Sequence, residues 1–327
     1  MQILIVRLGA LGDIVHAIPA VAALQRALPG AAIDWIVESR HRELLDLIKG
    51  LRRRLTIESA RAGTLAAVLR DLRSRRYDVA VDLQGLIKSA VLARLSGARR
   101  VVGFERRALR EPAAALFYGE RHPADDRQHV IRKNLALAAA LAPVGDRIEF
   151  PLEVPPADPE PTPYALINPG AAWPNKRWAP DRFGAVAGWL REKYGLRSLV
   201  LWGPGERQLA EAVADASAGA AQPAPETKIA DVLALSGRAA LMISGDTGPL
   251  HLAAAMGTPL IGLYGPTSPA RNGPWKPEDL VVSRFEVCGC HYGRRCRQAS
   301  ACLDWIAVED VCRAAAERLA RAGVPPA

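Results

Sequence analysis

A proline-rich segment divides the chain into two parts of similar length. Residues 151–163 hold six prolines among thirteen positions. Proline fixes φ and lacks a backbone N–H, so this segment can form neither a helix nor a central strand and should act as an extended, semi-rigid spacer. We therefore predict two domains, residues 1–150 and 164–327, joined by this linker. The length of 327 residues agrees, because it exceeds what one hydrophobic core usually serves.

Both parts show the same alternation of short apolar segments, glycine-bearing turns and amphipathic helices. In the first part we expect strands near 2–7, 32–37, 78–82 and 100–103, and helices near 14–28, 63–75, 86–96 and 128–141. In the second we expect strands near 164–168, 197–201, 240–244 and 259–263, and helices near 179–194, 205–216, 228–236 and 248–256. This alternation predicts an α/β fold of two doubly wound, Rossmann-like domains with parallel sheets. Ligands of such domains bind at the carboxyl ends of the strands, so we expect the domains to face a central cleft.

The excess of positive charge lies entirely in the first part. The net charge is +9, and residues 1–150 hold 25 Lys and Arg against 16 Asp and Glu, whereas the remainder holds 18 of each sign. Such a field concentrates anionic partners. Arg52 and Arg53 belong to a run of three arginines, which is either a solvated face or part of a binding surface. With only 6% aromatic residues and no recognition motif, nucleic acid is not favoured. An acidic small molecule and an anionic membrane surface both fit.

The sequence predicts neither a membrane span nor a signal peptide. The longest apolar run, residues 135–144, has ten residues, fewer than the roughly eighteen that a span needs. A charged residue interrupts the first apolar segment, and no small-residue cleavage site follows. We therefore expect a cytoplasmic protein whose five cysteines are thiols or ligands.

The turn after the first strand carries a candidate reactive carboxylate. Its pattern is G-x-x-G rather than G-x-G-x-x-G, so the dinucleotide fingerprint is missing, although Glu38 ends the second strand. The turn ends at Asp13, at the start of a helix. Asp13 is therefore either a helix cap or a group that takes part in chemistry.

Two turns in the second part favour an anion. Small residues precede Lys176, whose charge suits a phosphate, although a surface lysine in a loop is the alternative. Asp246 and Thr247 lead into a helix beginning near Gly248, where backbone N–H groups and the helix dipole attract anions. Asp246 could instead cap this helix, and His251 could be a half-buried structural histidine.

These motifs form an ordered series that resembles one protein family. The series is listed in chain order: Gly9–Asp13, Asp82–Ser89, Arg110–Pro112, Lys176–Trp178 and Gly245–His251. It resembles the lipopolysaccharide core heptosyltransferases of glycosyltransferase family 9, most closely the heptosyltransferase I members, over about residues 1–280. The resemblance implies a GT-B fold and inverting transfer of heptose from ADP-L-glycero-β-D-manno-heptose to the Kdo region of lipid A. The alternatives are a heptosyltransferase II-like member with a heptose acceptor and, less favoured, a nicotinamide-dependent oxidoreductase.

The resemblance also implies roles for single residues. Asp13, next to Gly12, matches the general base, and Lys88 and Arg110 match basic positions facing the Kdo acceptor. The charge distribution adds Arg52 and Arg53 to the acceptor side. The residues matching the donor site are Lys176, Glu206, Ile229, Asp246, Thr247, Gly248 and His251. Lys176 and the Thr247–Gly248 turn would hold the leaving diphosphate in place of a metal, so neither metal nor cofactor is expected. An acceptor on a lipid implies a peripheral protein on the cytoplasmic face of the inner membrane.

A cysteine-rich segment departs from the family pattern. Cys288, Cys290, Cys296 and Cys302 follow the pattern C-x-C-x₅-C-x₅-C, which is not a standard zinc-ribbon spacing. They are reduced thiols in a compact loop, ligands of a structural metal, or disulfide-bonded. Cys312 lies on the apolar stripe of the final helix, where we expect a core residue. That helix could return to pack on the first domain.

Overall fold

The computed structural model describes residues 1–58, 62–155, 163–296 and 300–327 and divides into two units, Met1–Glu153 and Val154–Ala327. Linker residues 156–162 lie outside the described residues. The start of the expected spacer is attached to the first unit, because Leu152 forms a β-bridge with Ile48 and the Lys49 N–H donates to the Pro151 carbonyl. The spacer therefore begins later in the chain than the first of its prolines.

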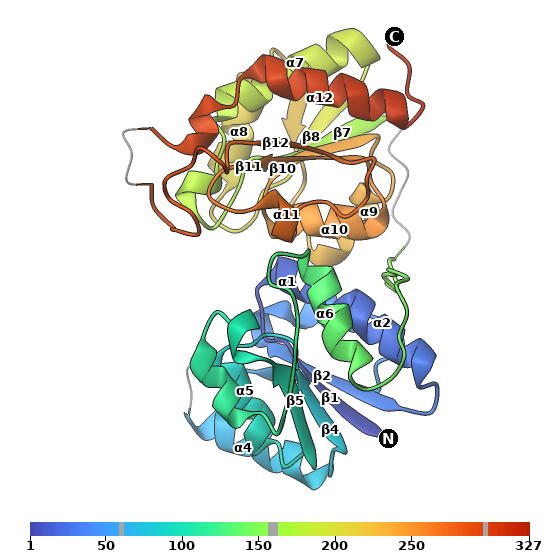
Figure 1. The fold of residues 1–327 in the computed structure, drawn as a ribbon. Helices are drawn as coiled ribbons and strands as arrows, with labels where there is room; N and C mark the ends of the chain where they lie inside the picture. The colour runs from blue at the N-terminus through green and yellow to red at the C-terminus, as the bar shows by residue number, and fades with distance from the viewer. Residues whose placement is uncertain (59–61, 156–162, 297–299) are drawn as a thin grey trace. The chain divides into compact units, whose positions relative to one another are not determined.

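The first unit contains one six-stranded parallel sheet in the order β3-β2-β1-β4-β5-β6 (Figure 1). Its strands are β1 (Gln2–Val6), β2 (Ala32–Glu38), β3 (Arg53–Ile57), β4 (Val79–Asp82), β5 (Arg100–Phe104) and β6 (Glu120–His122). Its helices are α1 (Leu11–Val15), α2 (Ile18–Ala27), α3 (Arg42–Asp46), α4 (Ala62–Ser74), α5 (Ile87–Leu95) and α6 (Val130–Ala139). Helices α2 and α6 pack together on one face, and α4 and α5 cover the other. Burial on both faces explains why β1 and β4 are almost wholly apolar.

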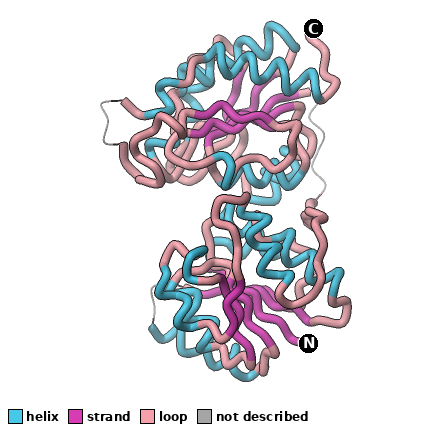
Figure 2. Tube along the Cα trace, viewed as in Figure 1, coloured by secondary structure: helices cyan, strands magenta, loops and turns pink. Residues whose placement is uncertain are grey.

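The second unit repeats this plan, with the strand order β12-β11-β10-β7-β8-β9. Its strands are β7 (Tyr164–Asn168), β8 (Arg197–Val200), β9 (Ala221–Pro223), β10 (Leu241–Gly245), β11 (Leu260–Tyr264) and β12 (Leu280–Ser283). Its helices are α7 (Pro180–Tyr194), α8 (Arg207–Asp215), α9 (Ile229–Ser236), α10 (Gly248–Met256), α11 (Pro269–Asn272) and α12 (Val308–Arg321). Figure 2 shows the strands of each unit as a central layer with helices on both sides. None of the helices in the described residues is long and apolar enough to cross a membrane.

The final helix, α12, packs within the second unit. It lies against α7 and β12, and its buried apolar side chains, Val311, Ala315 and Leu319, belong to that unit's core. Cys312, expected in the core, is half-buried at its margin. The apolar face of α12 is therefore covered by its own unit.

Each sheet has a switch point beside its first strand. Strand β1 lies between β2 and β4, and β7 lies between β8 and β10. Where the strand order reverses, successive connections leave in opposite directions and open a space for ligands at the carboxyl ends of the strands. The turns after β1, β4, β7 and β10 carry four of the five predicted motifs, and the fifth, Arg110–Pro112, follows β5. The predicted class of two doubly wound α/β domains is confirmed.

The predicted helix over 14–28 is in fact two helices. Pro19 occupies the second position of α2, where its missing N–H costs no helical hydrogen bond, so a new helix begins at Ile18. The preceding helix, α1, starts already at Leu11. Asp13 therefore lies within the first turn of α1 rather than in front of it.

Candidate functional site

The turn after β1 presents a carboxylate at the carboxyl edge of the first sheet. Oδ1 of Asp13 lies 2.7 Å from Nη2 of Arg7, and Oδ2 accepts the Ala10 N–H at 3.2 Å. The Asp13 side chain is 40% exposed, whereas that of Arg7 is only 7% exposed. Asp13 therefore bonds the backbone at the helix start and also keeps a carboxylate open to a ligand, so the two interpretations of this residue are compatible.

Arg7 joins the two turns at this switch point and was absent from the predicted site. Its guanidinium donates to the Leu83 carbonyl in the turn after β4, while it pairs with Asp13 after β1. The Leu8 N–H strengthens the same connection by donating to Oε1 of Gln84 at 2.7 Å. Arg7 directly follows a run of four apolar residues in the sequence, and a charge in that position is the signal that could have identified it. We infer that Arg7 positions the Asp13 carboxylate.

Lys88 lies in the first turn of α5, at the same edge of the sheet. Its Nζ is 2.8 Å from Oε1 of Glu38, the last residue of β2. Glu38 also pairs with Arg40 at 2.7 Å. A Cβ on Gly9 would lie 3.8 Å from Oε2 of Glu38, so this ion pair borders the glycine turn that leads to Asp13. Glu38 therefore forms ion pairs with two basic side chains at this edge, Lys88 and Arg40.

Arg110 is exposed in the segment that follows β5, between two short 3₁₀ helices, Arg106–Ala108 and Pro112–Phe117. The adjacent Glu111 accepts the N–H of Ile87, the first residue of α5, at 2.7 Å. This bond fastens the Arg110 segment to the helix that carries Lys88. Lys88, Arg110 and Asp13 therefore all lie at the carboxyl edge of the first sheet.

The arginine run, residues 52–54, has a structural role at the amino ends of the strands of that sheet. Arg52 precedes β3 and makes a two-pronged ion pair with the fully buried Asp34, at 2.7 and 2.8 Å. Arg53 pairs with Asp71 at 3.1 Å, and Arg54 donates to three backbone carbonyls. These residues stand at the amino end of β3, whereas Asp13 follows the carboxyl end of β1. This placement separates Arg52 and Arg53 from Asp13, Lys88 and Arg110, and it does not favour the expected acceptor role of these two arginines.

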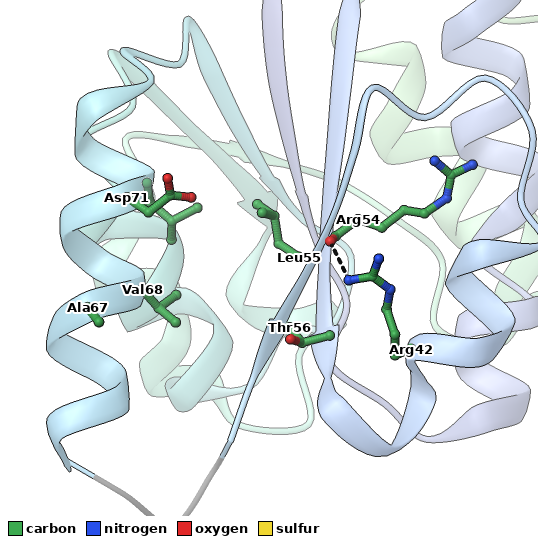
Figure 3. A pocket seen from close by; sticks show the side chains of 8 residues that line it. Arg42, Arg54, Leu55, Thr56, Ala67, Val68 and Asp71 are labelled. Carbon is green, nitrogen blue, oxygen red and sulfur yellow. Dashed lines mark hydrogen bonds between the residues drawn. The ribbon is translucent and has the colours of Figure 1, made fainter.

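A hollow between β3 and α4 lies beside this run (Figure 3). Leu55 and Val68 form apolar walls, and Arg42 reaches in from α3 and donates to the Arg54 carbonyl at 3.0 Å. Neither Asp13 nor Lys88 lines this hollow. It is therefore separate from the carboxyl-edge residues.

We expect Arg52→Gln to lower the free energy of unfolding by about 1–2 kcal/mol, in the lower range for a hydrogen bond to a charged group because the Arg52 side chain is 35% exposed. The change leaves the buried Asp34 carboxylate with the Tyr77 hydroxyl at 2.7 Å as a remaining partner. Urea unfolding would measure the effect. Arg99→Gln is the matched control, because that side chain is 78% exposed and its nearest carboxylate is 3.6 Å away. Equal destabilisation by the two substitutions would contradict the structural role of Arg52.

In the second unit, the turns after β7 and β10 are fastened to each other. Nδ2 of Asn168, the last residue of β7, lies 3.1 Å from the hydroxyl oxygens of both Ser244 and Thr247. A Cβ on Gly245 would lie 2.7 Å from the Lys176 carbonyl oxygen, so this close approach of two backbones requires glycine. Asn168 and Ser244 were absent from the predicted site. They hold together the two turns from which Lys176 and Asp246 extend.

Lys176 and Asp246 meet between these two turns. Nζ of Lys176 lies 2.6 Å from Oδ2 of Asp246, and the lysine side chain is 14% exposed. Nε2 of His251 lies 3.1 Å from the other carboxylate oxygen, and the Thr267 hydroxyl donates to Oδ2 at 2.7 Å. Asp246 thus bonds three side chains and does not cap α10. The structure brings together Lys176, Asp246, Thr247 and His251, as the sequence predicts.

The cluster holds Asp246 in its ionised form. Burial opposes ionisation, but the hydrogen bond with His251 and the charge of Lys176 outweigh it and hold the pKa of Asp246 well below its usual range. Thr247 occupies the N-cap position of α10, and its side chain makes no capping hydrogen bond. The first N–H groups of α10 therefore remain available to an anion beside Lys176.

Glu206 and Ile229 reach the same edge of the second sheet from the next strands. Glu206 follows β8, and its carboxylate lies 3.3 Å from Nη2 of Arg177 and from the Gly203 N–H that it accepts. A Cβ on Gly170 would lie 2.1 Å from Oε2 of Glu206, so the carboxylate borders the turn after β7. Ile229 is the first residue of α9 and is half-buried after β9.

Comparison with known proteins establishes the family. The family model described as glycosyltransferase family 9 (heptosyltransferase) matches residues 65–301. The chain belongs to glycosyltransferase family 9. Lipopolysaccharide heptosyltransferase 1 of Pseudomonas aeruginosa is 30% identical over 308 residues, which cover 89% of this chain and 86% of that protein. The protein of the same name from Escherichia coli K12 is 28% identical over 301 residues, which cover 86% of this chain and 93% of that protein.

Solved structures of this family agree in fold over nearly the whole chain. The E. coli heptosyltransferase WaaC with ADP has a TM-score of 0.82 and 25% identity, covering 97% of this chain and 100% of that chain. The E. coli heptosyltransferase II has a TM-score of 0.79 at 21% identity, covering 99% of this chain and 100% of that chain. The GT-B fold implied by the sequence resemblance is confirmed, and the family 9 chain is a heptosyltransferase. The oxidoreductase alternative is not favoured.

Proposed function

We propose that this family 9 enzyme transfers L-glycero-D-manno-heptose from ADP-L-glycero-β-D-manno-heptose to the Kdo region of lipid A, in the biosynthesis of the lipopolysaccharide inner core. Relatives named lipopolysaccharide heptosyltransferase 1 support this substrate class, as does WaaC solved with ADP and with ADP-2-deoxy-2-fluoro heptose. The observation that carries the proposal is the cluster of Lys176, Asp246 and Thr247 at the switch point between β7 and β10.

The second unit is proposed to bind the donor. The diphosphate would lie at the N-terminus of α10, where N–H groups and the helix dipole favour negative charge. Lys176 would neutralise the charge that develops on the leaving ADP, with Asp246 and His251 orienting the lysine. Glu206 would accept hydrogen bonds from the ribose, and Ile229 would pack against the adenine.

The first unit is proposed to bind the acceptor. Asp13 would take the proton of the acceptor hydroxyl while that oxygen attacks the anomeric carbon from the face opposite ADP, which inverts the configuration. The neighbouring Gly12 is proposed to lie beside the acceptor sugar, and Arg7 holds one carboxylate oxygen of Asp13. Among the described residues, the remaining oxygen makes only the long contact of 3.2 Å with the Ala10 N–H, so it is the one suited to accept the proton.

Lys88 and Arg110 are proposed to bind the anionic groups of the Kdo acceptor. We expect Lys88→Ala and Arg110→Ala each to raise the acceptor KM. For a contact through solvent, the rise should correspond to a loss of about 0.2–1 kcal/mol of binding free energy. A two-pronged contact from Arg110 would cost more. The effect should shrink as salt rises, since the Debye length falls from about 10 Å at 0.1 M to about 3 Å at 1 M. The donor KM should hardly change in initial-rate assays.

Arg94→Ala is the matched control for these two substitutions. Arg94 is exposed on the same helix as Lys88 but lies in its last turn, away from the carboxyl edge. We expect its acceptor KM to equal that of the unmodified enzyme. If all three substitutions raised the acceptor KM equally, a general effect of net charge would replace specific contacts.

The proposed site of action is the cytoplasmic face of the inner membrane, with the protein bound peripherally. The acceptor is carried by a membrane lipid, and the basic side chains at the carboxyl edge of the first sheet, including Arg106 and Arg107, are exposed. Exposed basic groups are attracted to anionic lipid surfaces within about one Debye length.

Thermal unfolding with candidate donors tests the proposed donor site. A ligand that binds only the folded state raises the melting temperature. ADP-heptose and ADP should raise it, and NAD should not. Stabilisation by NAD, or none by ADP-heptose, would contradict the assignment.

A further inference from the structure

Four cysteines that the transfer reaction does not use converge in the second unit. Sγ atoms of Cys288, Cys290 and Cys302 all lie within 4.8 Å of one another. Cys296 joins them, with its Sγ 3.6 Å from that of Cys290. Cys288, Cys290 and Cys302 are buried, and all four have free thiols. Four of the five cysteines of the chain thus surround one small volume.

The arrangement of the sulfurs fits a shared ion better than disulfide pairs. Sγ of Cys290 lies 3.1 Å from that of Cys288 and 3.6 Å from that of Cys296, so it approaches two partners at once. Two disulfides would instead separate the sulfurs into pairs. With metal–sulfur bonds of about 2.3 Å, the sulfurs of a tetrahedral site are about 3.8 Å apart. Small movements of the side chains would bring this cluster to that geometry.

The surroundings of the cluster also suit thiolates. Nδ2 of Asn175 lies 3.9 Å from Sγ of Cys290 and donates to the Gly293 carbonyl at 2.8 Å, so an amide N–H group borders a sulfur. Donors of this kind orient metal ligands and stabilise their charge. His291 stacks on Phe285, and its Nε2 lies 2.8 Å from the Phe285 carbonyl oxygen. His291 is therefore engaged elsewhere, and the four sulfurs make a complete tetrahedral set.

We propose that Cys288, Cys290, Cys296 and Cys302 bind one structural transition-metal ion as a tetrathiolate site. Tetrahedral sulfur ligands select zinc or iron. Each thiol releases its proton to solvent when the ion binds, so four thiolates and a divalent cation carry a net charge of −2. The exposed Arg294 and Arg295 in the same loop offset part of this charge.

This ion would hold a loop against the segments that shape the proposed donor site. The loop after β12 has little regular structure, and the Tyr292 N–H fastens it to the Pro266 carbonyl at 2.7 Å. Pro266 precedes Thr267, which donates to the Asp246 carboxylate. On the other side, the Asn175 that borders Cys290 precedes Lys176. The site would therefore stabilise the surroundings of the Lys176–Asp246 ion pair without touching the substrate.

Metal analysis of the full chain, purified without chelators or metal-affinity resin, tests the proposal directly. We expect one zinc or iron atom per chain, identified by inductively coupled plasma mass spectrometry. After denaturation with EDTA but without reductant, all five cysteines should react with an alkylating reagent. A protein that carries neither metal, or one whose denatured cysteines resist alkylation because they are paired as disulfides, would overturn the proposal.

Substitutions locate the ion. Cys288→Ser should abolish metal binding, whereas Cys312→Ser, the matched control on α12, should retain one atom per chain. Asn175→Ala keeps all four sulfurs and should weaken metal affinity about tenfold in competition with a chromophoric chelator. This second variant keeps the test valid if Cys288→Ser fails to fold. Unchanged metal affinity in both the Cys288 and the Asn175 variants would place the ion elsewhere and overturn the assignment.

Discussion

Asp13→Asn should lower the turnover number by about 10²–10⁴-fold, the range for loss of a general base. Asparagine can still accept the Ala10 N–H through its amide oxygen, so it preserves the backbone contact that Asp13 makes at the start of α1. It cannot take a proton from the acceptor hydroxyl. Binding of ADP should change little, because the proposed donor residues lie in the second unit. Steady-state kinetics with both substrates and calorimetry with ADP would measure the two quantities.

Asp46→Asn is the matched control for this substitution. Asp46 is also an ion-paired carboxylate of the first unit, 2.6 Å from Nε of Arg42, but it ends α3 and is not part of the carboxyl-edge site. We expect its turnover to be normal. Near-normal turnover of Asp13→Asn would mean that the carboxylate only stabilises the helix start.

Lys176→Met should reduce turnover by about 10²–10³-fold, as expected when a group that stabilises developing charge is removed. The donor KM should rise and the acceptor KM should stay constant, because the lysine is proposed to contact only the diphosphate. The change also removes a partner of the buried Asp246, which keeps its bonds with His251 and Thr267. Initial rates at varied ADP-heptose concentrations, together with the melting temperature, would separate loss of catalysis from loss of folding.

Lys193→Met controls for the loss of a lysine from the same unit. Lys193 is exposed near the end of α7, where it pairs with the neighbouring Glu192 at 3.5 Å. We expect normal kinetics for this variant. If Lys176→Met instead left turnover unchanged, the diphosphate would have to be neutralised by other groups.

Interior strands could be predicted from the sequence, and edge strands could not. The eight expected strands correspond to β1, β2, β4, β5, β7, β8, β10 and β11, each flanked by two neighbours. The missed strands, β3, β6, β9 and β12, are the edges of the two sheets. Interior strands of a parallel sheet are buried on both faces and read as apolar runs. The edge strands β6 and β9 have only three residues each, and β3 begins with two arginines, so none of these three forms an apolar run.

The individual turns of the site could be predicted from the sequence, but the side-chain contacts between different turns could not. Each motif lies in a local strand-to-helix turn, so glycine and charge patterns identify it. The ion pairs Lys176–Asp246 and Lys88–Glu38 join residues 70 and 50 positions apart, which only the sheet order brings together. Net charge likewise does not show whether a basic residue lies at the amino ends or at the carboxyl ends of the strands. The structural ion pairs of Arg52 and Arg53 were not foreseen because β3, which Arg52 precedes and Arg53 begins, was not recognised as a strand.

The most direct test of the proposed function is product analysis by mass spectrometry. The purified enzyme would be incubated with ADP-L-glycero-β-D-manno-heptose and a Kdo-bearing lipid A acceptor, and a parallel reaction would offer an acceptor that already carries the first heptose. The proposal predicts that the Kdo-bearing acceptor gains the mass of one heptose, with stoichiometric release of ADP, and that the heptosylated acceptor gains none. Transfer only to the heptosylated acceptor, or no transfer from ADP-heptose to either, would contradict it.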